Sequence, residues 1–291
     1  MAAWLTTQSR KSSGFLLALP AILWLGIFFI LPLVFVLVIS FMTRGSSGSP
    51  ALPFTLEQYE RVFSVYGSVI QDSVWIAFVT MVICLITGYP IAFYIKTRRT
   101  TLGRQFALFL VILPFWTNFL VRTYAWRMLL GREGVVNSII MDLGLSQRPL
   151  PLLGTEFAVM VGLVYGFLPF MVLPIYASVE RFDFRLAEAA ADLGANAWNT
   201  FWRVVFPMTL PGVIAGCILV FIPAIGTFVT SDLLGGRQGQ MIGSSIYEQF
   251  LGSGNMPLGA ALSWVLMGMV IIALMVYARF AEPKGAQKNN G

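Results

Sequence analysis

The sequence predicts an all-α membrane protein, a polytopic bundle of six transmembrane helices. Hydrophobic residues make up 57% of the 291 positions and charged residues 11%, whereas soluble domains carry about 25% charged side chains. The apolar residues stand in unbroken blocks, without the periodic polar positions of an amphipathic helix or a half-buried strand. Blocks of this length cross a hydrocarbon layer of about 30 Å as helices. We therefore expect lipid to surround most of the chain.

Six apolar blocks follow one another along the chain. The first is longer than the roughly 7 to 15 apolar residues of a secretory signal, so we expect an uncleaved helix there. Prolines inside the blocks are compatible with a membrane bundle, where neighbouring helices satisfy the freed carbonyls. A flexible external connector is expected at 45–53. The predicted spans are residues 15–41, 69–95, 106–130, 157–179, 208–230 and 259–280.

A single integral membrane domain is expected to cover residues 1–291. Residues 1–68 would form an N-terminal helix and an external loop, and residues 69–280 a five-helix core. Within that core, the long loop at 180–206 is placed in the cytoplasm.

The orientation of the bundle follows from its Lys and Arg residues. They gather in the two terminal segments and in the loops around 96–104 and 181–203. Because short cationic loops stay in the cytoplasm, both termini are predicted to be cytoplasmic. We interpret the net charge of +6 as this topology signal, and expect no nucleic-acid partner.

The sequence offers little for catalysis. Its two cysteines, Cys84 and Cys217, lie in separate apolar blocks, and histidine is absent, so neither a disulfide framework nor a zinc spacing is present. The commonest general base and metal ligand is therefore missing. We expect no catalytic residues, no metal and no cofactor.

The long cytoplasmic loop has the start and stop signals of two short amphipathic helices. Asp183 is placed to cap the first helix, and Gly194 to end it in a left-handed conformation. Asn196 would cap the second, whose aromatic residues recur at helical spacing and include Trp198 and Phe201. Pro207 is expected to end this helix at the membrane. An apolar surface of this kind needs a cover, either another protein or the bilayer.

This loop resembles the EAA loop of ABC importer permeases. The likeness rests on Glu188-Ala189-Ala190, on Gly194 six residues after the glutamate, and on Pro207 thirteen residues after the glycine. Val204, Val205 and Phe206 stand where the family has Ile-x-Leu, which are conservative changes. The resemblance implies a type I importer fold in the bacterial inner membrane. It also implies that the loop, with Glu188 as polar anchor, Gly194 as elbow, and Trp198 and Phe201, couples the bundle to an ATPase.

The same resemblance implies several partners. Two ATP-binding cassette subunits, a second permease in a hetero- or homodimer, and an external solute-binding protein are expected beside the bilayer. The chain lacks the G-x-x-x-x-G-K-[ST] motif that cradles nucleotide phosphates. ATP hydrolysis is therefore expected in a partner subunit.

Several strings resemble the polyamine branch of this family: residues 113–118, 121–124, 164–172, 231–236 and 257–261. A polyamine is a flexible polycation, suited to carboxylates at its ends and aromatic faces between them. Asp232 is the candidate cation contact, with Trp116, Tyr124 and Tyr165 as candidate walls. Asp232 could instead cap a loop or contact the delivery protein, and the aromatics could simply pack.

Other interpretations stay open. Relatives that move iron, sulfate, thiamine or opines share the fold, and Arg122 and Arg127 would repel a polycation unless they pair with Glu133 or face headgroups. An ion-coupled secondary transporter would need inverted repeats and ionisable residues at the midplane. A membrane-embedded enzyme would need a nucleophile with a base, or a metal cluster. The pairs Gly162/Gly166 and Gly212/Gly216 have the spacing of helix contacts, within this chain or between subunits.

Overall fold

The structure is a computed structural model that describes residues 18–46, 48–98 and 100–281. The chain divides into two compact units, residues 1–64 with 248–265 and residues 65–247 with 266–291. The cationic termini and Arg99, on which part of the orientation prediction rests, lie outside the described residues.

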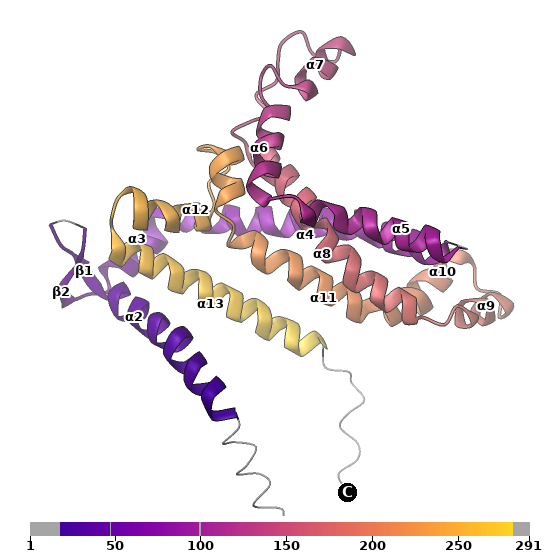
Figure 1. Cartoon of the computed structure of the whole chain (residues 1–291), viewed down its shortest axis with the longest axis horizontal. Helices are drawn as coiled ribbons and strands as arrows, with labels where there is room; N and C mark the ends of the chain where they lie inside the picture. The colour runs from indigo at the N-terminus through magenta and orange to yellow at the C-terminus, as the bar shows by residue number, and fades with distance from the viewer. Residues whose placement is uncertain (1–17, 47, 99, 282–291) are drawn as a thin grey trace, which may run out of the picture. The chain divides into compact units, whose positions relative to one another are not determined.

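The first unit begins with an apolar helix and continues into a small hairpin (Figure 1). A helical stretch of hydropathy 3.1 spans Ala18–Ser40. The connector at 45–53, which we expected to be flexible, instead contributes a strand that pairs antiparallel to residues 42–44. Thr43 Oγ1 donates to the Ala51 carbonyl at 2.8 Å. The elements are η1 (Gly26–Ile30), α2 (Leu31–Ser40), β1 (Met42–Arg44), β2 (Pro50–Phe54), α3 (Glu57–Val65), η5 (Glu248–Gly252) and the start of α13 (Met256–Ala281).

The second unit is built on three long helices that pack on one another, α4, α8 and α11 (Figure 1). Buried side chains from all three helices form their shared core, among them Cys84, Met171 and Val220. The elements of this unit are α4 (Gly67–Thr97), α5 (Thr101–Ile112), η2 (Leu113–Trp116), α6 (Phe119–Leu129), α7 (Val135–Asp142), α8 (Glu156–Arg181), α9 (Arg185–Asp192), α10 (Ala197–Thr200), η3 (Phe201–Val205), α11 (Phe206–Ile225), η4 (Ser231–Gly235), α12 (Ile242–Tyr247) and the rest of α13.

Glycines bring these helices close together. A Cβ on Gly216 would lie 2.8 Å from the sulfur of Met171 on α8, and one on Gly212 would collide with the Pro174 carbonyl and Ser178. A Cβ on Gly162 would lie 2.7 Å from Leu234. Glycine thus serves packing inside this chain at Gly162, Gly212 and Gly216.

The third predicted span, 106–130, is wrong as a single helix. Helices Thr101–Trp116 and Phe119–Leu129 meet at an angle of 90° (Figure 1). Pro114 lies in the 3₁₀ turn η2, and the Asn118 side chain caps α6 by accepting the Leu120 N–H at 2.8 Å. A proline followed by an N-cap residue ends one helix and begins another.

The membrane bundle itself is confirmed. Among the described residues, five helices are long and apolar enough to cross a membrane, and a sixth span is present if the bent pair counts as one. The predicted boundaries of α4, α8 and α13 hold within a few residues. The fifth block differs more, because its helix ends at Ile225 and its helical stretch begins at Ala197.

Candidate functional site

The loop after α8 folds into the two short helices that its sequence predicts. Asp183 Oδ1 accepts the Arg185 N–H at 3.0 Å as α9 begins, and Asn196 Oδ1 accepts the Asn199 N–H at 2.8 Å as α10 begins. Gly194 has a φ of +85°. The N–H groups that come after α9 bond back to the Ala191 and Ala190 carbonyls at 2.9 and 3.0 Å, the pattern of a Schellman C-cap.

The expected end of the second helix at Pro207 is wrong. The chain stays helical from Ala197 to Ile225, and Pro207 occupies the second position of α11. A proline ring in a regular α-helix would meet the carbonyl four residues earlier, here that of Arg203. The turn before it is instead a π-turn, Phe201–Val205, in which the Phe206 N–H bonds to the Phe201 carbonyl. The wider turn allows the helix to continue past Pro207 without interruption.

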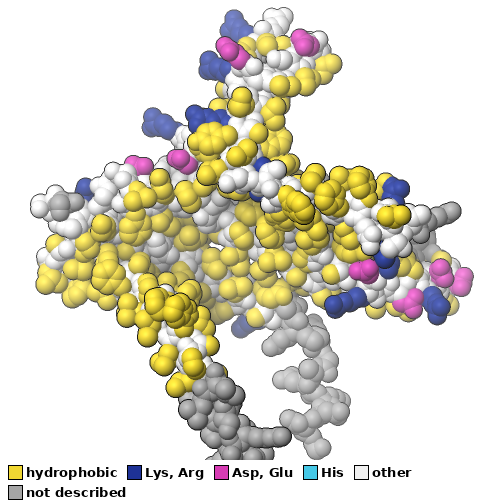
Figure 2. Space-filling model, viewed as in Figure 1, with side chains coloured by type: hydrophobic (Ala, Val, Ile, Leu, Met, Phe, Trp, Pro, Cys, Tyr) yellow, Lys and Arg dark blue, Asp and Glu magenta, His cyan; other side chains and the backbone are white. Residues whose placement is uncertain are grey.

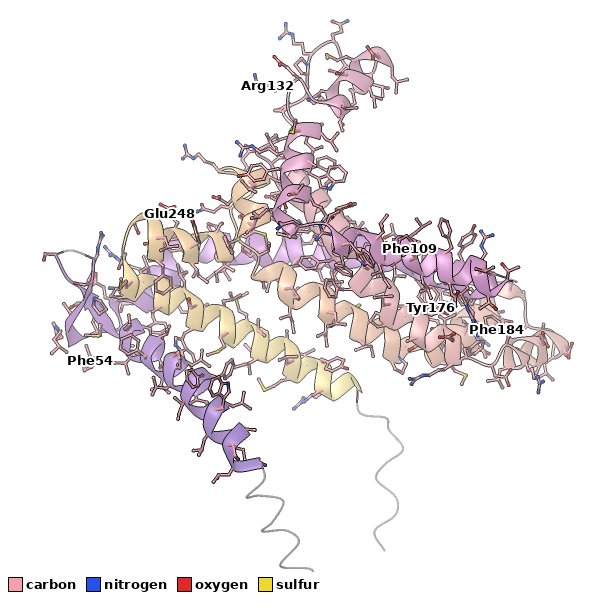
Figure 3. All side chains as sticks on the ribbon, in the orientation of Figure 1. Phe54, Phe109, Arg132, Tyr176, Phe184 and Glu248 are labelled. Atoms are coloured by element: carbon pink, nitrogen blue, oxygen red, sulfur yellow. The ribbon has the colours of Figure 1, made fainter. Side chains whose placement is uncertain are left out.

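One side of the loop packs on the bundle through aromatic rings. The ring centroids of Phe201 and Tyr89 lie 5.5 Å apart, and those of Phe184 and Phe93 lie 5.7 Å apart. Phe201, which the sequence grouped with the coupling residues, is thus half-buried against α4. Figure 3 shows Phe184 at the same end of the helices as Tyr176.

The opposite side of the loop is open. Glu188 and Ala189 are exposed and Ala190 is half-buried. Leu193 is 89% exposed and Trp198 68% exposed. Figure 2 shows charged side chains gathered over α9 and over α6 and α7, while the visible face between them is mainly hydrophobic. The loop therefore exposes both large apolar side chains and charged side chains.

A cluster of polar contacts, here called the polar clamp, holds the end of α8 from which the loop starts. It consists of Lys96, Arg104, Tyr176 and Glu180. Glu180 Oε1 lies 3.5 Å from Arg104 Nη1 on α5 and accepts the Tyr176 hydroxyl at 3.0 Å. Lys96 Nζ donates to the Glu180 carbonyl at 3.0 Å. Sequence reasoning counted these cations only as topology signals. A carboxylate among them at a helix end was the signal that could have revealed the clamp.

Asp232 lies on the turn η4 beyond α11, and its side chain is exposed. Buried hydroxyls hold this turn in place. Ser231 Oγ donates to the Gly239 carbonyl at 2.7 Å and accepts the Met241 N–H at 3.0 Å. The Ile242 N–H then donates to Ser73 Oγ on α4 at 2.8 Å. Sequence reasoning missed these serines, because serine is common in loops and no spacing distinguishes them.

The candidate wall residues belong to different contact groups. Trp116, 78% exposed, packs on Phe109 of α5 with ring centroids 6.2 Å apart. Tyr165 packs on Trp126 of α6 at 5.7 Å, and Tyr124 is half exposed. Among the described residues, no ring contact connects Trp116, Tyr124 and Tyr165 with one another.

Arg122 lies over two aromatic rings. Its guanidinium carbon is 5.7 Å from the Phe119 ring and 5.9 Å from the Tyr165 ring. Nε and Nη1 are buried and have no hydrogen-bond partner among the described residues. The two ion pairs of the described residues involve neither Arg122 nor Arg127. The pairing with Glu133 is therefore not seen, and cation–π contacts take its place.

Comparison with known proteins gives a consistent result. Residues 85–282 match the family model described as binding-protein-dependent transport system inner membrane component. The spermidine/putrescine transport system permease protein PotB of Haemophilus influenzae is 44% identical over 88% of this chain and 90% of its own length.

Solved structures agree on the fold. A bacterial ABC transporter involved in import of the acidic polysaccharide alginate has a chain that superposes with a TM-score of 0.76, at 16% identity, over 97% of this chain and 100% of its own. The alginate transporter in complex with a pentasaccharide-bound periplasmic protein gives 0.75 at 16% identity, over 95% and 98%. This chain belongs to the family of binding-protein-dependent transport system inner membrane components.

Proposed function

We propose that this chain is the permease subunit of an ATP-driven importer that carries polyamines, spermidine and putrescine among them, into the cytoplasm. The observation that carries the proposal is the 44% identity, over 88% of the chain, to a protein named as a spermidine/putrescine permease. The exposed carboxylate of Asp232 agrees with a cationic substrate. In this proposal Asp232 contacts one amine, and Trp116, Tyr124 and Tyr165 line the path.

Energy would come from two ATP-binding subunits that dock on the loop between α8 and α11. The exposed side chains of Leu193, Trp198 and Trp202 support this assignment, because several large apolar side chains exposed on one loop mark an interaction site. Glu188 is exposed beside them and would pair with a cation of the ATPase. ATP-driven closure of those subunits would move the loop and shift the bundle between its inward and outward states.

The remaining partners follow from the family. Its dependence on a binding protein supports an external solute-binding protein that delivers the polyamine. A second permease, identical or different, would supply the other half of the pathway. In this arrangement the coupling loop and both termini lie in the cytoplasm.

Uptake of labelled spermidine and putrescine by vesicles that contain the reconstituted complex tests this proposal, with and without ATP. We expect ATP-dependent uptake in the wild type and a loss of about tenfold or more in Glu188→Ala, the factor for one interaction with a charged group. Glu133→Ala, which removes an exposed carboxylate outside the loop, should leave uptake unchanged. Uptake of neither amine, together with ATPase activity stimulated by another solute, would overturn the polyamine assignment and keep the importer.

A further inference from the structure

A buried hydrogen bond joins two of the three core helices next to the coupling loop. The hydroxyls of Tyr89 on α4 and Thr209 on α11 lie 2.8 Å apart, and the two residues are 8% and 0% exposed. Thr209 Oγ1 also lies 3.0 Å from the Val205 carbonyl, to which it donates. Because a threonine hydroxyl has one proton, Tyr89 is then the donor to Thr209.

The two bonded residues lie close to a proline in each helix. Pro90, inside α4, comes directly after Tyr89. Thr209 comes two residues after Pro207 and four after the π-turn Phe201–Val205. Prolines and π-turns are the places where helices bend. The hydrogen bond therefore connects two points at which a helix can change direction.

The ring of Tyr89 also contacts the coupling loop itself. Its centroid lies 5.5 Å from that of Phe201, edge to face, and 6.0 Å from that of Phe206. One side chain thus contacts the loop with its ring and α11 with its hydroxyl. By contrast, the ring contact between Phe184 and Phe93 involves no hydroxyl and adds no hydrogen bond.

We propose that Tyr89 and Thr209 are positioning residues that make α4 follow the coupling loop during transport. This inference rests on the proposed function. When ATPase closure shifts the loop, movement of α11 alone would open only one wall of the bundle. The hydroxyl pair transmits the same shift to α4, so the bundle moves as a unit.

Uptake per ATP hydrolysed, measured in the reconstituted complex, tests the inference. Tyr89→Phe and Thr209→Val each remove one hydroxyl and keep the side-chain shape. In each variant we expect ATP hydrolysis to continue while the ratio of uptake to hydrolysis falls about fivefold, the factor for one typical net hydrogen bond. The double variant should be no worse than either single one, because the hydroxyls act as a pair.

The matched control is Thr87→Val, which removes an α4 hydroxyl that bonds only to carbonyls of its own helix. It should keep the wild-type ratio. A wild-type ratio in Tyr89→Phe, or an equal fall of uptake and hydrolysis in that variant, would assign the bond to stability alone and overturn the inference. Failure of the proposed function would show differently, as absent ATP-driven polyamine uptake in every sample, the wild type included.

Discussion

Asp232 combines an exposed carboxylate with a rigid support. The turn that carries it is fastened through Ser231 to the Gly239 carbonyl and the Met241 N–H. A carboxylate on a fixed turn loses little conformational freedom when it meets a cation. A fixed position of this kind suits the cation contact that we propose for Asp232.

Replacing Asp232 with Asn should weaken polyamine uptake and leave assembly intact. We expect the concentration for half-maximal uptake to rise about tenfold, because one charge-assisted contact is lost. Asp142→Asn, at the exposed end of α7, is the control of equal charge change. Unchanged uptake in Asp232→Asn would remove this residue from the substrate path.

Local signals at single residues were predictable, whereas contacts between distant residues were not. The cap at Asn196 and the left-handed Gly194 follow from rules that act within one turn of the chain. The predicted cap at Asp183 is wrong by one residue, because Phe184 is the N-cap of α9 and Asp183 accepts the Arg185 N–H from the position before it. The hydrogen bond between Tyr89 and Thr209 joins residues 120 positions apart, and no periodic pattern in the sequence predicts it. For the same reason the role of Ser73 beneath the Asp232 turn could only come from the structure.

At the scale of elements, the coupling loop has two faces in different surroundings. Phe184 and Phe201 pack inward on α4, while Leu193 and Trp198 remain open to solvent. Sequence reasoning grouped Trp198 and Phe201 on one apolar surface, because a helical spacing alone does not say which side meets the bundle.

Leu193→Asp should abolish binding of the ATP-binding subunits without unfolding the permease. Leu193 is 89% exposed, so an aspartate there meets water in the free permease and unfavourable burial in the complex. Copurification of the ATPase subunit with the tagged permease measures this. Leu145→Asp, in a connection that is predicted to lie outside the cell and with 74% exposure, should retain the subunit. Retention in Leu193→Asp would place the docking surface elsewhere.

Helix interruptions were the least predictable part of the fold. Pro114 lies inside an apolar block and Pro207 directly before one. The chain nevertheless stays helical at Pro207, after a π-turn, and breaks by 90° after Pro114. The difference lies in the capping of the next helix. Asn118 offers a side-chain cap that starts a new helix after Pro114, whereas α11 begins at Phe206 without any side-chain cap and continues the preceding turn.

At the scale of the whole molecule, the predicted orientation separates two sets of exposed residues. The coupling loop with Leu193 belongs to the cytoplasmic set, and the connection between α6 and α8, with Leu145, belongs to the external set. This assignment depends on the positive-inside rule, which acts on Lys and Arg near the spans.

Single cysteines introduced into a variant lacking Cys84 and Cys217 would establish this orientation. In intact spheroplasts we expect an impermeant thiol reagent to label Leu145→Cys and to leave Leu193→Cys unlabelled. A permeant reagent should label both. Labelling of Leu193→Cys alone by the impermeant reagent would invert the topology and contradict cytoplasmic termini.

The 90° break carries a consequence for the surrounding bilayer. The 12 residues of α5 and the 4 of η2 rise together by roughly 26 Å, less than the hydrocarbon thickness of about 30 Å. This stretch is therefore too short to span the layer by itself, so α6 has to complete the span or the membrane has to thin around it. Because lipid cannot solvate irregular backbone, we expect Thr117 and Asn118 to be covered by water, by other helices of this chain or by a neighbouring subunit. We therefore expect no direct contact of lipid with the backbone of the break.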